Sequence, residues 1–208
     1  NNYTFGPATA FTWSCWMKAQ NFSANRRFIS KTSQDANVYG YNLGHTNAGK
    51  LWAQMRAPSS LRAHTYSTTL TAGVWYHVVF SYAGGSNING MLAYIDGSVE
   101  PAPSSGSLNA WTVTDPLTFG NRGNTFHFSG NLNQITLWNK ALSSSEVTEL
   151  YNSGSPNDPT TTSMSANLIG YWGLNDDSNF PTEVDLQGSV NGTLTNMEIG
   201  GYDSGDVP

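Results

Sequence analysis

The sequence has few charged residues, one cysteine and no long apolar run, and each of these shortages excludes a class of protein. Only nine lysines and arginines stand against 14 aspartates and glutamates, so the net charge is −5. A nucleic-acid-binding domain would need a basic surface to neutralise phosphates, and this composition excludes it. No apolar stretch approaches the roughly 20 residues of a membrane-spanning helix. Most of the polarity comes from Asn, Ser, Thr and Gly instead of ions, which favours neutral partners.

The single cysteine cannot form an internal disulfide. Cys15 belongs to an alternating set with Phe11, Trp13 and Met17, and this period predicts a buried, inert thiol on the core side of a strand. A core of this size can be stable without disulfides, so their absence fits an extracellular protein as well as a cytosolic one. The chain begins NNYTFG without a signal-peptide pattern, which is typical of a mature product, a fragment or an internal domain.

Residues 126–154, FHFSGNLNQITLWNKALSSSEVTELYNSG, join an alternating strand to a short helix. Apolar and polar residues interleave through GNLNQITLWNKAL, as in a half-buried strand. Ser143 and Glu146 then predict a capping box, because each side chain can bond the other residue's backbone amide. The helix presents one apolar stripe, and Gly154 is placed to supply the left-handed residue that ends it. The stripe consists of Val147, Leu150 and Tyr151.

This segment resembles the C-terminal signature of laminin-G-like, concanavalin-A-like jelly-roll domains, in which a strand ending in tryptophan precedes an Ala-Leu-Ser helix start. Further segments resemble the same family in the same order: residues 11–19 (FTWSCWMKA), 71–99 (TAGVWYHVVFSYAGGSNINGMLAYIDGSV) and 116–123 (PLTFGNRG). The resemblance implies an all-β fold, an antiparallel two-sheet jelly-roll sandwich with one short helix near residues 144–152. It implies little about function, because one fold carries many functions.

The residues support the same fold without the resemblance. The apolar run at residues 78–82 predicts a strand, Asp96-Gly97 predicts a hairpin turn, and glycine-rich turns recur between short strand-like runs. All-β sandwiches often run to about 200–250 residues as one domain. Residues 1–208 are therefore predicted to form a single domain.

After the helix, residues 153–167 are predicted to form a long crossover, and LIGYWGL at residues 168–174 a strand that completes the sandwich. Residues 193–199 predict another strand. In many members of the family a similar YW strand stands at the start of the domain. Its place at the end of this chain implies either that the order of strands is circularly shifted or that the sequence was cut from a tandem array of domains at a different boundary. The closing stretch, residues 191–197, is similar to repeats in virion structural proteins of bacteriophages.

The resembled fold also carries glycosidases and lyases, so paired carboxylates bear on whether the chain is an enzyme. A retaining glycosidase needs two carboxyl groups about 5 Å apart. Glu183 and Asp185 are two residues apart, but Pro181 and the polar neighbours predict a loop there. Neither a His-Glu-x-x-His nor a Gly-x-Ser-x-Gly motif occurs, and we interpret His77 as a structural strand residue. We therefore expect no enzymatic activity.

Calcium is the metal that the composition could hold. Calcium takes several oxygen ligands, usually carboxylates and carbonyls from loops, and the densest acidic loop supplies Asp176, Asp177 and Asp185. Related domains often hold calcium at a sandwich edge through Asp and Asn, so the resemblance supports a site at these three residues. The alternative is that Asp176 and Asp177 form Asx turns and keep a loop solvated.

Alternating aromatic and polar residues suggest a ligand-binding face. Aromatic rings stack on the C–H surfaces of neutral sugars, while amides and arginines bind hydroxyl groups. Period two places each strand's set on one side of its sheet. If that side is open, the residues form a sugar platform; if it faces the other sheet they are core, and a protein-contact surface is a third reading. The candidates are Tyr39 and Tyr41, then Trp52, Gln54 and Arg56, with Arg62 and His64 nearby.

The sequence thus leaves two functions open. The first is a non-catalytic carbohydrate-binding or adhesion module that binds a glycan or polysaccharide, in a secreted or virion-surface protein. The second is a structural or protein-interaction domain of a phage virion or other large assembly, without sugar binding. Both place the domain outside the cell or on a virion surface, next to other subunits or domains.

Overall fold

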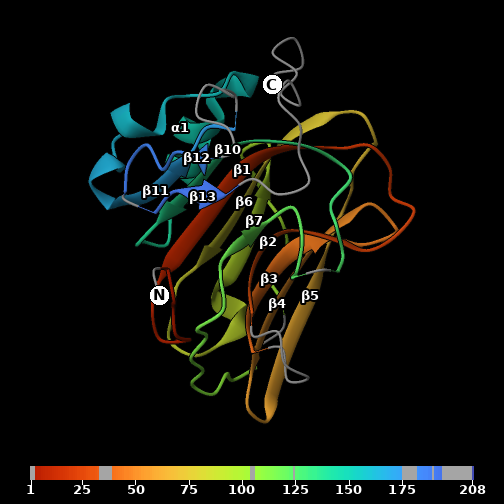
Figure 1. Ribbon diagram of the computed structural model, residues 1–208, viewed down its shortest axis with the longest axis vertical. Helices are drawn as coiled ribbons and strands as arrows, with labels where there is room; N and C mark the ends of the chain where they lie inside the picture. The colour runs from red at the N-terminus through yellow and green to blue at the C-terminus, as the bar shows by residue number, and fades with distance from the viewer. Residues whose placement is uncertain are drawn as a thin grey trace.

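The computed structural model describes residues 3–32, 39–103, 106–123, 125–174, 182–188, 190–193 and 208. Two antiparallel sheets lie face to face, and a small two-stranded sheet lies near the C-terminal end (Figure 1). The small sheet pairs β12 (Thr182–Glu183) with β13 (Gly192–Thr193). This architecture confirms the predicted all-β, two-sheet jelly-roll sandwich.

The larger sheet has six strands in the order β11-β10-β1-β6-β7-β8. Its central strand β1 pairs with β10 on one side and with β6 on the other. The Asp96-Gly97 turn joins β7 to β8 with positive φ at both residues, as predicted. The strands are β1 (Phe11–Ala19), β6 (Trp75–Tyr82), β7 (Met91–Ile95), β8 (Ser98–Val99), β10 (Gly130–Trp138) and β11 (Leu168–Trp172).

The second sheet has five strands in the order β5-β4-β3-β2-β9. A register shift in β2 between Arg27 and Ile29 turns both Phe28 and Ile29 toward the core, where each is at most 1% exposed. The strands are β2 (Arg26–Thr32), β3 (Gly40–His45), β4 (Lys50–Ala57), β5 (Ser60–Thr69) and β9 (Thr118–Phe119).

The main core fills the space between the two sheets. Trp13 of β1 stacks with Trp172 of β11 and packs against Tyr41 of β3, so both sheets and the C-terminal strand meet around one indole. Cys15 lies in the same core, and burial raises the pKa of its thiol far above the ordinary value. The structure therefore confirms the prediction that the Cys15 thiol is buried, and this burial disfavours the reactive thiolate.

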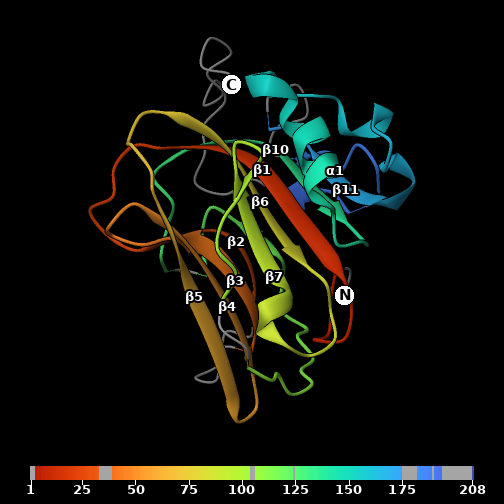
Figure 2. The same cartoon turned by 180° about the vertical axis from the view of Figure 1, so that it is seen from behind.

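A second core lies on the outer side of the six-stranded sheet, under α1 (Ser144–Tyr151) (Figure 2). The capping box forms as predicted, because Ser143 accepts from the amide of Glu146 and the Glu146 carboxylate accepts from the amide of Ser143. Leu142 and Val147 both belong to this second core. The residue that ends the helix is Asn152, with φ 45° and ψ 47°, and not Gly154. Asparagine is tolerated in this left-handed conformation.

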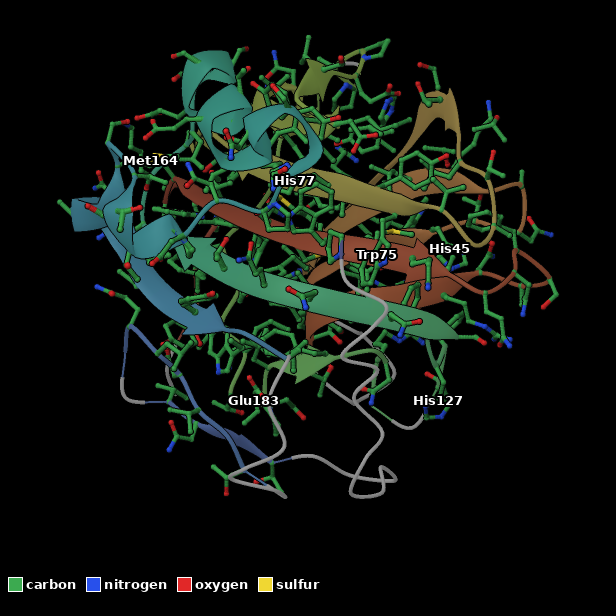
Figure 3. The ribbon with its side chains drawn as sticks, turned by 90° about the horizontal axis from the view of Figure 1, so that it is seen from above. His45, Trp75, His77, His127, Met164 and Glu183 are labelled. Atoms are coloured by element: carbon green, nitrogen blue, oxygen red, sulfur yellow. The ribbon has the colours of Figure 1, made fainter. Side chains whose placement is uncertain are left out.

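His77 belongs to β6, and its ring faces Tyr151 of the helix α1 (Figure 3). Its Nε2 is 3.0 Å from Ser14 Oγ, its Nδ1 has no hydrogen-bond partner, and its ring stacks on Tyr151. Burial lowers the pKa of His77 to about 3, so the ring is neutral in the folded protein at pH 7.

The C-terminal part of the chain closes one edge of the sandwich. The predicted strand at 168–174 is β11, which pairs with β10 and buries Leu168 in the second core and Trp172 in the main core. Of the strand predicted at 193–199, only Thr193 of β13 lies within the described residues. Three-residue 3-10 turns connect the remaining elements: η1 (Ile88–Gly90), η2 (Asn152–Gly154), η3 (Pro159–Thr161) and η4 (Ser165–Asn167).

Within the described residues, the structure contains no helix with the length and hydropathy needed to cross a membrane.

Candidate functional site

The outer face of the five-stranded sheet carries the best candidate for a ligand-binding site. Along β4 the side chains alternate strictly, so that Leu51, Ala53 and Met55 are fully buried in the core. Trp52 and Gln54 point the other way and are half-buried. The sequence left open which face these residues occupy, and the structure places them on the outer one. The outward residues of β4 are Lys50, Trp52, Gln54 and Arg56.

Across the sheet, Arg27 of β2, Gly44 of β3 and Trp52 of β4 stand opposite one another. The guanidinium carbon of Arg27 lies 3.8 Å from the centroid of the Trp52 ring, which is a close cation–π contact. Gly44 stands between them in the sheet and has no side chain, and a Cβ there would lie 2.0 Å from the carbonyl oxygen of Arg26. No side chain therefore stands between the arginine and the tryptophan.

The stack continues into the loop that precedes β10. Arg27 also lies 4.9 Å from the ring of Phe126, and the guanidinium of Arg122 lies 4.4 Å from that same ring. We call Trp52, Arg27, Phe126 and Arg122 the stacked row. Burial, and then the positive charge of Arg122, lower the pKa of Arg27 to about 10, while burial lowers that of Arg122. Both arginines are still cationic at neutral pH.

A chain of polar side chains runs beside the stacked row. Ser30 Oγ donates to Asn42 Oδ1 at 2.8 Å, and Asn42 Nδ2 donates to Gln54 Oε1 at 3.2 Å. These bonds fix the orientation of the Gln54 amide and leave its NH2 group for a further acceptor. The outer face therefore combines a tryptophan ring, guanidinium groups and an oriented amide. That combination suits a ligand with C–H surfaces and many hydroxyl groups.

The other candidates from the sequence lie elsewhere. Tyr41 is 1% exposed and faces the core opposite Met55, and Tyr39 packs against the same core. Arg62 and His64 stand opposite Met55 and Ala53, so they lie on the inner side of β5. The structure thus corrects the grouping of Arg62 and His64 with Trp52. Period two assigns a face within one strand but does not relate the faces of two strands.

The proposed calcium ligands are only partly described. Asp176 and Asp177 lie outside the described residues. Asp185 is 5% exposed, and its carboxylate accepts five hydrogen bonds. The described residues contain no group of three or more acids, histidines or cysteines placed to share a metal ion. Asp185 therefore has a structural role in this structure, and calcium binding stays a prediction. The five donors are the hydroxyl of Tyr3 and the amides of Tyr171, Gln187, Gly188 and Val190.

The acid pair at Glu183 and Asp185 lies in a structural setting. Glu183 belongs to the short strand β12 (Figure 3), not to the predicted loop, and is 7% exposed. Its Oε1 accepts from the amide of Leu174, and Asp185 is saturated as described. Both carboxylates accept hydrogen bonds from backbone amides of the C-terminal segment, as buried carboxylates require, and so they stabilise that segment.

Sequence reasoning missed Arg27, Phe126 and Arg122. The sequence RRFIS does not show a regular alternation of apolar and polar residues, because Phe28 and Ile29 are adjacent and both face the core. The register shift next to Arg27 causes this, and a period of two therefore does not reveal that Arg27 points outward. Phe126 and Arg122 come from a loop, and a loop's position over a sheet cannot be read from periodicity.

Comparison with known families agrees with this fold. A family model, described as the concanavalin A-like lectin/glucanases superfamily, matches residues 1–148. The chain belongs to this superfamily. Comparison with curated proteins gave no match.

Three of the solved structures with a related fold are bacterial. A Bacteroides ovatus protein to which carbohydrate binding is ascribed has a TM-score of 0.66 and 16% identity, over 89% of this chain and 52% of its own. The binding domain of a paraclostridial mosquitocidal protein has a TM-score of 0.57 and 18% identity, over 74% and 39%. A Ruminococcus gnavus sialidase module, CBM40, bound to α2,3-sialyllactose, has a TM-score of 0.58 and 15% identity, over 69% and 83%. The chain spans about half or less of the first two proteins, and these likenesses show the fold alone.

Proposed function

We propose that this domain is a non-catalytic carbohydrate-binding module of a secreted or surface-exposed protein, and that its ligand lies on the outer face of the five-stranded sheet. The observation that carries the proposal is the placement of Trp52, Gln54 and Arg56 together on that face, with Arg27 stacked on the indole. Trp52 and Arg56 are four residues apart on one strand, hence roughly 13 Å apart. That separation is about the length of two or three sugar rings.

The structural likenesses support the same proposal. The fold resembles a sialidase module that was solved with a bound glycan, and the likeness covers most of that module. The second function open from the sequence, an interaction domain without sugar binding, has no described feature in its favour, and the experiment below tests it.

Two of the described glutamates have properties that support a non-catalytic role. The Glu100 carboxylate accepts hydrogen bonds from the amides and hydroxyls of Ser67 and Thr68, which outweigh its burial and lower its pKa. Glu146 is similarly held by Lys140 and Ser143, and its pKa is lowered as well. A general acid needs a raised pKa and access to a ligand, and these groups have neither.

A glycan array that includes algal and bacterial polysaccharides tests the proposal. The folded protein is expected to bind at least one polysaccharide, and Trp52→Ala is expected to lose that binding. Trp75→Ala is the matched control, because Trp75 is also half-buried under a cation, Lys18 at 5.5 Å, but lies on the other sheet. Circular dichroism should show both variants folded. Absence of binding by the wild-type protein, or equal loss in both variants, would overturn the proposal and favour an interaction domain.

A further inference from the structure

Four of the nine positive charges of this acidic protein lie on one face. Of its nine lysines and arginines, Arg27 and Arg122 belong to the stacked row, and Lys50 and Arg56 project from β4 on the same side. Within the described part of the chain, none of these four forms an ion pair. The chain as a whole carries a charge of −5, so a group of unpaired cations is opposite to what its composition suggests.

Five of the described acids are engaged elsewhere. Glu146 pairs with Lys140 at the start of α1, and Glu149 accepts from Ser163 beyond the helix. Glu100 caps the backbone at the outer edge of β5, while Glu183 and Asp185 hold the C-terminal segment. These five carboxylates are therefore engaged away from the outer face.

Arg27 is held on this face with few hydrogen bonds and next to another positive charge. Its side chain is 6% exposed, and among the described residues its Nη1 donates only to the carbonyl of Arg26 and its buried Nε finds no hydrogen-bond partner. Arg122, whose guanidinium also contacts the Phe126 ring, repels it. Two like charges near each other without a counter-ion destabilise each other, and an anion bound at the half-buried Arg122 would relieve this repulsion.

We propose that the ligand is an acidic polysaccharide, and that a carboxylate or sulfate group on a sugar ring binds beside Arg122 and Arg27. This inference rests on the proposed carbohydrate-binding function and names the class of ligand. The planar guanidinium fork matches both anions with two parallel hydrogen bonds. Trp52 contacts the ring that carries the anion, and Lys50 and Arg56 lie on either side of Trp52 along β4, placed to meet the charges of neighbouring units.

Matched polymer pairs test the inference. Dextran is compared with dextran sulfate, and methyl-esterified polygalacturonate with its free acid, so each pair shares a sugar backbone, one member of each pair is charged, and the charged group is sulfate in one pair and carboxylate in the other. We expect the acidic member of at least one pair to bind ten or more times tighter than its neutral partner. Raising the salt from about 0.05 M to about 0.5 M should remove most of this preference, because the Debye length shortens severalfold.

Charge-matched variants separate a built site from general attraction. Arg122→Gln is expected to weaken binding of the acidic polymer about tenfold, as for loss of a charge-assisted hydrogen bond. Arg122→Lys keeps the charge without the fork and should recover part of that loss. Lys18→Gln removes the same charge on the six-stranded sheet and should leave binding unchanged. The melting temperature of each variant is measured alongside.

The outcomes distinguish this inference from the function on which it rests. Equal weakening by Arg122→Gln and Lys18→Gln would overturn the inference, because only net charge would then matter. Neutral polymers bound as tightly as acidic ones, with binding lost in Trp52→Ala, would also overturn it while supporting the carbohydrate-binding module. If no polymer or glycan bound at all, both proposals would be wrong.

Discussion

The hydroxyl group of Tyr3 donates a hydrogen bond to Asp185 Oδ2 at 2.8 Å, and it also contacts the carbonyl oxygen of Ile169 at 3.0 Å. These bonds tie the first described residue of the chain to its C-terminal segment across 182 positions of sequence. Burial, and then Asp185, raise the pKa of Tyr3 well above its ordinary value, so the hydroxyl keeps its proton at neutral pH. The two ends of the described chain are thus parts of one packed structure.

Truncation after Asn157 is therefore expected to abolish cooperative unfolding. The deletion removes β11, which pairs with β10 and supplies Trp172 to the main core, together with the hydrogen-bond partner of Tyr3. Urea denaturation followed by fluorescence measures the effect. Tyr3→Phe is the control: it loses about 1 kcal/mol with the hydrogen bond and should still unfold in one transition. A truncated chain with wild-type stability would contradict the prediction that residues 1–208 form one domain.

Two tryptophan substitutions should differ sharply in their effect on stability. Trp13 is fully buried, so Trp13→Ala is expected to cost roughly 3–5 kcal/mol in free energy of unfolding. Trp52 is half-buried on the outer face, so Trp52→Ala is expected to cost about 1–2 kcal/mol, including the lost contact with Arg27. Chemical denaturation of both variants checks this order. If Trp52→Ala were as damaging as Trp13→Ala, Trp52 would be a packing residue and unsuited to ligand binding.

Much of the fold could be predicted because its signals are local. The capping box needs only Ser143 and Glu146, and the hairpin turn needs only Asp96 and Gly97. The binding face could not be predicted, since it depends on the register of β2, β3 and β4 and on the bulge that turns Arg27 outward. The sequence of a strand predicts which residues share a face. Which of the two faces is exposed depends on how the strand pairs with its neighbours and packs on the core.

Acid should destabilise the protein through His77. Its pKa is about 3 in the folded protein and about 6.5 in the unfolded chain, so between these values the unfolded state binds more protons. The stability is therefore complete above about pH 6.5 and falls as the pH is lowered toward 3, by up to about 1.4 kcal/mol per pH unit. The pKa of His45 is also lowered, mainly by burial, so His45 likewise reduces the stability of the folded protein as the pH falls.

Urea midpoints measured from pH 7 to pH 5 check this dependence. His77→Gln removes one titrating group, and its stability should fall with a shallower slope than that of the wild-type protein. The difference between the two curves isolates His77 from His45 and from the carboxylates. Identical slopes would show that His77 is not the acid-sensitive group.

Calcium binding at Asp176, Asp177 and Asp185 is tested by thermal melting. Binding to the folded state would raise the melting temperature in millimolar calcium relative to a chelator. Since Asp185 already accepts five hydrogen bonds, an ion would have to displace some of these donors, and Asp185→Asn should abolish any rise. An unchanged melting temperature would contradict an accessible calcium site.

The position of Cys15 gives the protein a natural reporter of its own unfolding. The thiol is 1% exposed between the two sheets and is the single cysteine of the chain. A thiol-labelling reagent can reach it only when the sheets separate, because burial also keeps it from forming the reactive thiolate. The rate of labelling therefore counts opening events of the whole sandwich under native conditions. It could follow each variant and each ligand without an added label or an engineered residue.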